Sequence, residues 1–183
     1  MFAEIVLMSQ DFERFLNDSR IHEAARRRRH ARDELELLAG ETTMLDVIAA
    51  CAEAQEEVSI TLVDGRLRTG LIVSYGTDMV MQSTSDAHQI RLIPYQAISV
   101  IDCGTATGTA TGTDLPGSAV TLHDVLTEWA QNRMPVVAHA VGTAVAGTLS
   151  AAGADVICVL TPQRTHRYLA VYSLTEVSAS SVS

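Results

Sequence analysis

The stretch V58-S-I-T-L-V-D-G-R-L-R-T-G-L-I-V-S-Y75 decides the fold of this 183-residue chain. Its first six residues alternate apolar and polar side chains, which is the period of a half-buried β-strand. Asp64-Gly65 is a dipeptide typical of a tight turn between two strands. The second run, residues 67–81, contains Gly70, and a glycine inside a strand is typical of a sharp bend. A β-hairpin with a bent second strand is therefore predicted here.

The same pattern returns 77 residues later in the chain. Three glycines and an aspartate recur at one spacing, and the matched residues are Gly65, Gly70, Gly76 and Asp78 with Gly142, Gly147, Gly153 and Asp155. Ahead of each copy stands a Thr-x-x-Asp sequence, at Thr43 and at Thr121, which is typical of the capping box that opens a helix. The sequence therefore predicts a duplicated β-domain in which a short helix precedes each copy.

Segments outside the repeats complete the predicted organisation. Residues 9–39 read as one long helix, because no proline or glycine interrupts them and Gly40 stands where a helix would end. The segment after the first copy is rich in Gly, Thr and Ala without a periodic face, which is typical of a linker. The predicted parts are a helical arm over 1–40, a first domain over 41–102, a linker over 103–117, a second domain over 118–178 and a tail over 179–183.

The residues quoted above resemble those of the Sm-like fold, and most closely the bacterial Hfq family of RNA chaperones. The stretch 58–75 looks like that family's first strand pair, and Y95-Q-A-I-S-V-I101 looks like its last strand. The resemblance implies a mainly β fold with helices (α+β): a long N-terminal helix, then two five-stranded small barrels, each preceded by a short helix. Because Sm-like barrels join edge to edge, it also implies a homo-oligomer or tandem barrels packed on each other, and RNA as a ligand.

The side chains that bind RNA in that family are replaced here. Asp78 stands where the family has an aromatic side chain that stacks on a base. The segment Tyr95-Gln96-Ala97 lacks the family's Lys-His pair, and Ile93-Pro94 replaces the Arg-Gly pair of the eukaryotic and archaeal members. Base stacking contributes about 1–3 kcal/mol per base. Barrels without these groups are therefore expected to bind RNA weakly.

Positive charge is concentrated at the start of the chain. The formal net charge is −9, of which −1 belongs to residues 1–40 and −8 to residues 41–183. The candidate nucleic-acid contacts are Arg26, Arg27, Arg28, Arg29, Arg32 and Arg91. Arginine suits phosphate oxygens because its planar fork matches their geometry. The same cluster also fits a solvated helix face with internal pairs, such as Glu23 with Arg27.

The residue patterns predict no enzyme, no cofactor and no metal site. The six histidines show no ligand spacing, and no nucleophile elbow or phosphate-binding loop is present. Asp78 and Asp155 are expected to cap tight turns in two separate domains. Three widely spaced cysteines predict reduced thiols and a cytoplasmic protein. No apolar run approaches the roughly 20 residues that a membrane helix needs.

Two hypotheses for the function follow from these observations. In the first, the chain is a non-enzymatic module that binds RNA or another nucleic acid weakly and without sequence preference, through the arginine-rich helix and the barrels. In the second, it is a protein-interaction or assembly scaffold with no affinity for nucleic acid. The −8 charge of residues 41–183 favours the second hypothesis, and the resemblance favours the first.

Overall fold

Two capped helices and ten strands account for most of the chain that the structure describes. The computed structural model describes residues 43–84, 89–103 and 119–180, all within a unit that begins at Thr43. The first group of elements is α2 (Met44–Ala54), β1 (Glu57–Leu62), β2 (Leu67–Tyr75), β3 (Met79–Ser83), β4 (Gln89–Pro94), the 3-10 turn η1 (Tyr95–Ala97) and β5 (Ile98–Asp102). The second group is α3 (Leu122–Gln131), β6 (Pro135–Ala140), β7 (Thr143–Ala152), β8 (Val156–Leu160), β9 (His166–Ala170), η2 (Val171–Ser173) and β10 (Leu174–Ser180).

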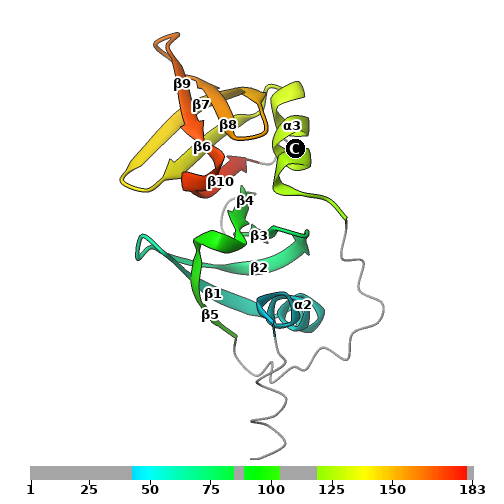
Figure 1. The fold of residues 1–183 in the computed structure, drawn as a ribbon. Helices are drawn as coiled ribbons and strands as arrows, with labels where there is room; N and C mark the ends of the chain where they lie inside the picture. The colour runs from blue at the N-terminus through cyan, green and yellow to red at the C-terminus, as the bar shows by residue number, and fades with distance from the viewer. Residues whose placement is uncertain (1–42, 85–88, 104–118, 181–183) are drawn as a thin grey trace, which may run out of the picture. The chain divides into compact units, whose positions relative to one another are not determined.

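All ten strands belong to one antiparallel sheet. Its order is β5-β1-β2-β3-β4-β10-β6-β7-β8-β9, so β4 and β10 lie between the two groups of strands (Figure 1). The prediction of two separate five-stranded Sm-like barrels is therefore wrong, because strands of both copies share a single open sheet. The prediction of an α+β fold is also wrong, because the described residues form a mostly β fold with two helices. Side-chain alternation sets which face of a strand is buried but not which strand its edge meets, so the sequence pattern could not distinguish these arrangements.

The two halves of the sheet repeat one arrangement. The first half-sheet has the order β5-β1-β2-β3-β4, and the second has the corresponding order β10-β6-β7-β8-β9. A Cβ atom at Gly70 would collide with the carbonyl oxygen of Ser83, and one at Gly147 with the carbonyl oxygen of Leu160, 77 residues after Ser83. Both glycines thus let a neighbouring strand approach closely at the same place.

The predicted capping boxes open both helices. The Asp46 carboxylate accepts a hydrogen bond from the Thr43 backbone N–H at 2.7 Å, and the Asp46 backbone N–H donates to the Thr43 hydroxyl. Thr121 and Asp124 make the same pair of contacts at the start of α3. Each box satisfies amide groups that the first turn of a helix leaves without partners.

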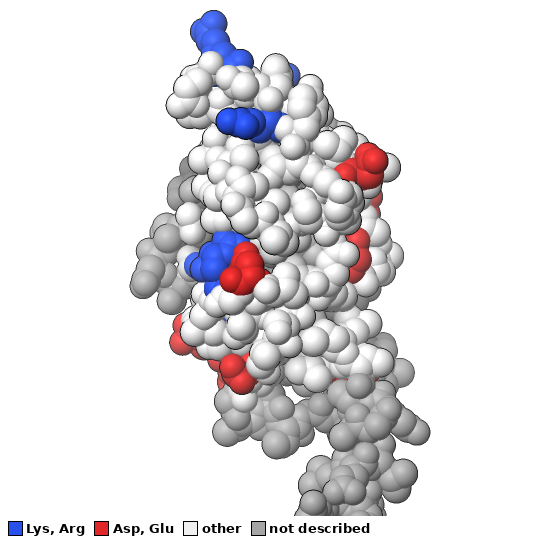
Figure 2. Space-filling view, turned by 60° about the vertical axis from the view of Figure 1, so that its left-hand side comes forward, with Lys and Arg blue, Asp and Glu red and all other residues white. Residues whose placement is uncertain are grey.

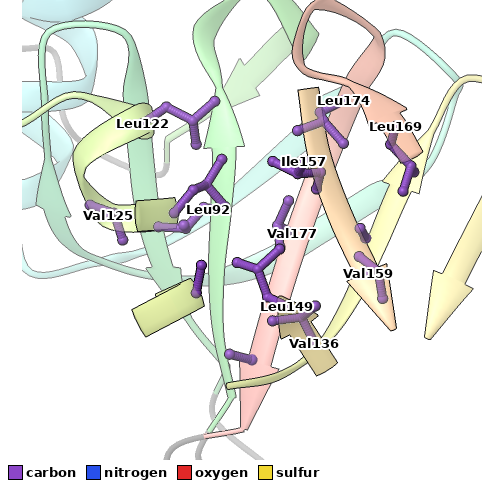
Figure 3. Close-up of a cluster of buried hydrophobic side chains, with 14 of the residues drawn as sticks. Leu92, Leu122, Val125, Val136, Leu149, Ile157, Val159, Leu169, Leu174 and Val177 are labelled. Atoms are coloured by element: carbon purple, nitrogen blue, oxygen red, sulfur yellow. The ribbon is translucent and has the colours of Figure 1, made fainter. Parts of the chain in front are cut away.

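The buried apolar side chains form two clusters. One packs α2 against β1, β2 and the β4–β5 segment, and contains Ile48, Val58 and Ile60. The other packs α3 against the second half-sheet and also contains Met79 and Leu92 of the first half-sheet. Figure 3 shows Leu92 of β4 beside Val177 of β10 and Ile157 of β8. The second core therefore extends across the line where the half-sheets meet.

A disulfide bond joins Cys51 of α2 to Cys103, one residue beyond β5. The prediction that all three thiols are reduced is wrong for this pair, and it leaves Cys158 as the free cysteine of the chain. Sequence spacing could not reveal the pair, because the two residues meet only once α2 lies across the first half-sheet.

Several predicted segments lie outside the described residues. These are the helix over 9–39, almost all of the linker over 103–117 and the last three residues of the tail. Neither α2 nor α3 is long and apolar enough to cross a membrane, and these are the helices that the structure describes.

Candidate functional site

The junction between the half-sheets is a four-residue antiparallel pairing of β4 with β10. Val177 lies opposite Leu92, Ser178 opposite Arg91 and Ala179 opposite Ile90. On its other edge, β10 pairs with β6. The strand of the second copy that corresponds to β5 therefore holds the two halves together.

A buried carboxylate at this junction gathers three arginines. Glu176 of β10 is only 3% exposed, and its Oε2 lies 2.5 Å from Nε of Arg68 on β2. Nη1 of Arg66 lies 3.7 Å from the same oxygen, and Nε of Arg91 lies 3.8 Å from Oε1. Arg66 also donates to the hydroxyl of Thr175 at 2.6 Å. These contacts connect the β1–β2 hairpin of the first half-sheet to the last strand of the second.

Arg91, the candidate nucleic-acid contact within the described residues, is held inside this cluster. Its Nη1 donates to the Thr69 carbonyl at 3.3 Å and to Oε1 of Gln82 at 3.4 Å. Burial lowers the pKa of Arg91, although the charge of Glu176 opposes that effect. A guanidinium with these partners is committed to internal contacts and offers little to a phosphate.

Positive charge forms no continuous patch on the face of the described residues that Figure 2 shows. Figure 2 shows a face that is mostly uncharged, with blue and red side chains next to each other near its middle. The described residues contain eleven carboxylates and six arginines. Arg66 forms a 2.6 Å ion pair with Asp64, in addition to its contact with Glu176.

A groove of about 480 Å³ lies beside the junction and is lined by both halves. Asp78 and Asp155, which were expected in two separate domains, both line this one groove. Oδ1 of Asp78 accepts a hydrogen bond from the backbone N–H of Leu122, the first residue of α3, at 2.7 Å. The Asp78 side chain therefore caps a helix of the other half.

The two matched tyrosines of this groove have different surroundings. The hydroxyl of Tyr95 donates to the Gly76 carbonyl at 2.7 Å, and burial raises the pKa of Tyr95 to about 12. Tyr172 is 78% exposed, although its backbone carbonyl accepts from Gln96 at 3.4 Å. The first tyrosine is packed and hydrogen-bonded at the rim of the groove, whereas the second is exposed to solvent.

The other predicted site residues have structural positions. Gly65 and Gly142 have φ values of 82° and 76°, which the turns after β1 and β6 require. Gly76 lies against the backbone carbonyl of Val120, which precedes α3. Arg26, Arg27, Arg28, Arg29 and Arg32 lie outside the described residues.

Sequence reasoning missed Glu176, Arg66 and Arg68, and it did not identify Glu176 as the partner of Arg91. The signal was a single glutamate in the strand pattern of residues 174–179, where the neighbouring side chains are apolar or small. A charge at such a position requires a buried partner. The partners come from more than 80 residues earlier in the chain, so no local spacing could identify them.

The comparisons with known proteins add no relative. No family model matches the chain, and no curated protein matches its sequence.

Proposed function

We propose that this protein is a non-enzymatic assembly module whose described unit joins end to end with further copies of itself. The observation that carries the proposal is the internal junction between β4 and β10. Each of these two strands has a counterpart in the other repeat, and the two counterparts form the outer edges of the sheet. By the 77-residue offset, β9 corresponds to β4 and β5 corresponds to β10. Within the described residues, β5 pairs only with β1, and β9 only with β8.

The residues on these edges fit a second junction. If β9 of one copy met β5 of the next in the register of β4 and β10, Leu169 would face Val100, Tyr168 would face Ile101 and Arg167 would face Asp102. Tyr168 is 71% exposed and Val100 is 46% exposed. Opposite charges and apolar pairs directly across two strands are favourable. Exposed apolar side chains on a free edge strand are also typical of a surface that another strand covers.

The contact between Asp78 and the start of α3 also has a counterpart among the residues of the other repeat. Asp78 caps α3 at Leu122, which is buried. The corresponding residues are Asp155, which is exposed, and Met44 at the start of α2, which is 41% exposed. We expect Asp155 of one copy to accept from the Met44 backbone N–H of the next, which would bury the methionine as Leu122 is buried.

The ionic cluster would not be repeated between copies. The residues matching Arg68, Arg91 and Glu176 are Val145, Tyr168 and Ser99. The internal junction therefore contains a buried ionic network, whereas the proposed junction between chains is mostly apolar. Because the two junctions differ in this way, β10 would pair with β4 of its own chain, and β9 would pair with β5 of the next chain.

Nucleic-acid binding has less support from the described residues. Arg91 is tied to Glu176 and Gln82, and the groove carries two carboxylates, which repel phosphates. Binding of single-stranded RNA by the full chain, measured by fluorescence polarisation at about 50 and about 200 mM salt, would favour that function if it is submicromolar at the lower salt.

The cytoplasm is the proposed location of the protein. The Cys51–Cys103 disulfide is the observation against it, since a reducing compartment disfavours such a bond.

The test is the oligomeric state of the full chain and of charge variants at the proposed junction. Sedimentation velocity across a range of protein concentrations should show concentration-dependent assembly of the wild type. D102R and R167D should each raise the concentration needed by at least about tenfold, because like charges then face each other. The double variant D102R/R167D, and an equimolar mixture of the two single variants, should restore assembly.

The proposal has a clear point of failure. A wild-type chain that stays monomeric at every concentration would overturn it, and so would assembly that neither single variant weakens. R133D is the matched control for the charge change, because Arg133 lies in the α3–β6 turn and outside the proposed contact. It should assemble as the wild type does.

A further inference from the structure

The hairpin of β8 and β9 brings a free thiol and an imidazole together. Sγ of Cys158 lies 3.3 Å from Nδ1 of His166. Cys158 faces Tyr168 across the strand pair and His166 faces Leu160, so the two residues are diagonal neighbours on one face of the sheet. Because Cys51 and Cys103 are joined to each other, Cys158 is the single free thiol of the 183 residues.

The thiol lies on the face of β8 that points away from the core. Its neighbours Ile157 and Val159 belong to the large apolar cluster, and Cys158 does not. On β7 the residue opposite Cys158 is Ala151, and on β9 the titratable side chains of this face are His166 and Tyr168. His166 and Tyr168 are both exposed. The cysteine is only 7% exposed, and the two side chains beside it on β9 are themselves exposed.

We propose that Cys158 is a nucleophilic modification site that reacts with low-molecular-weight disulfides, with His166 as the base that takes its proton. When the ring proton is on Nε2, Nδ1 accepts the hydrogen bond that the thiol donates. A nucleophile and a base within hydrogen-bond reach are the arrangement that activates a thiol. His166 is exposed and belongs to neither of the two buried apolar clusters.

The reaction balances without any further component. The thiol proton moves to Nδ1, and Sγ attacks one sulfur of the disulfide. A new S–S bond forms between Cys158 and that sulfur while the original S–S bond breaks. The leaving thiolate then takes the proton from Nδ1, so the protein thiol is oxidised to a mixed disulfide and one small thiol is released.

The site is compatible with the proposed assembly but does not depend on it. Strand pairing at β9 would cover its backbone edge, whereas Cys158 and His166 lie on a sheet face. The modification can therefore be measured on the monomer at high dilution, and its outcome is separate from that of the assembly test.

The test is the rate at which the full chain, without reductant, reacts with 5,5′-dithiobis(2-nitrobenzoic acid). Near about pH 6.5 the wild type should react at least about tenfold faster than H166Q, because the variant lacks a base at Nδ1. Near about pH 9 the two rates should approach each other, since hydroxide then removes the thiol proton directly. H166N is a second variant without the base. H123Q is the matched control, because His123 is an exposed histidine on α3, and it should react at the wild-type rate.

Glutathione disulfide then tests the class of reactant. Intact mass should show a single mixed disulfide on the wild type, slower formation on H166Q and none on C158S. Equal rates for the wild type and H166Q at both pH values would overturn the role of His166. Absence of the glutathione adduct on a chain that reacts with the aromatic reagent would overturn the assigned class of reactant.

Discussion

A carboxylate as buried as that of Glu176 is stable only while its charge is compensated, because desolvation of a lone charge costs several kcal/mol. Three arginines supply this compensation, and they come from β2, β4 and the turn before β2. Nη1 of Arg66 is itself buried without a hydrogen-bond partner in the described residues, so its contact with Glu176 is purely ionic. Charge at this residue therefore decides how well the two half-sheets hold together.

We expect E176Q to lower the free energy of unfolding by about 3 kcal/mol, because it leaves three partly buried guanidinium groups without the buried counter-charge that they share. Urea denaturation followed by circular dichroism measures the loss. D64N is the control within the same cluster: Asp64 lies on the turn, and its more exposed ion pair with Arg66 should contribute less than about 1 kcal/mol. Similar losses for both variants would show that Glu176 is not the centre of the cluster.

His139 gives the same region a dependence on pH. Burial, together with the positive charge of Arg66, lowers the pKa of His139 from its usual 6.5. The unfolded chain then binds the proton more tightly than the folded chain, so the free energy of unfolding falls as the pH drops through about 6.5. The urea midpoint of the wild type should therefore be lower at about pH 5.5 than at about pH 7.5.

H139Q should lose less stability between these two pH values than the wild type. The pH range stays above the region where carboxylates titrate, so histidines are the side chains that change charge in it. H123Q serves as the control because His123 is on the exposed side of α3, and it should keep the wild-type dependence. An unchanged dependence in H139Q would assign the effect to another group.

At the scale of single elements, α2 is held to the first half-sheet both by packing and by a covalent bond. It packs Ile48 and Ala49 into the first core, and the disulfide ties Cys51 to the end of β5. In α3 the residue corresponding to Cys51 is Trp129, which packs against the second core instead. A covalent link in one half thus takes the place of a large aromatic side chain in the other.

Reduction of the disulfide should lower the free energy of unfolding by about 4 kcal/mol, the entropic value for a loop of 52 residues. Thermal denaturation with and without reductant measures it. The double variant C51S/C103S should show the lower stability in both conditions, and C158S should respond to the reductant as the wild type does. No change on reduction would mean that α2 is held by packing alone.

The elements that the sequence predicts best are those that rest on local chemistry. The Thr43 and Thr121 capping boxes and the Asp64-Gly65 turn each follow from a few adjacent residues. The sequence pattern merged β2 and β3 into one run, although Gly76-Thr77-Asp78 separates the two strands. Pairing of β4 with β10, the Cys51–Cys103 bond and the partners of Glu176 all join distant residues, and no local pattern encodes which distant edge a strand meets.

For the whole molecule, duplication explains both the shared sheet and its free edges. The two repeats, joined head to tail, use one junction between β4 and β10 and leave β5 and β9 as the outer edges of the sheet. An interface of this heterologous type repeats from chain to chain, and it closes into a ring or continues as a filament according to the rotation at each step. The proposed assembly therefore needs only contacts of the kind that the chain already makes internally.

The shared core predicts that the described unit unfolds as one body. Met79 and Leu92 of the first half-sheet belong to the cluster of the second, so loss of either half exposes apolar surface of the other. Fluorescence of Trp129, the single tryptophan and a residue of the second half, should follow the same urea transition as far-UV circular dichroism.

The variant I60V tests this coupling with a substitution in the first half-sheet, whereas Trp129 reports on the second half. Ile60 is fully buried in the cluster of the first half-sheet, and removal of one methyl group should cost about 0.5–1.5 kcal/mol. If the halves unfold together, the Trp129 transition shifts by the full amount although the substitution lies in the other half. If the halves were independent domains, I60V would leave the Trp129 transition in place and split the circular dichroism curve into two steps.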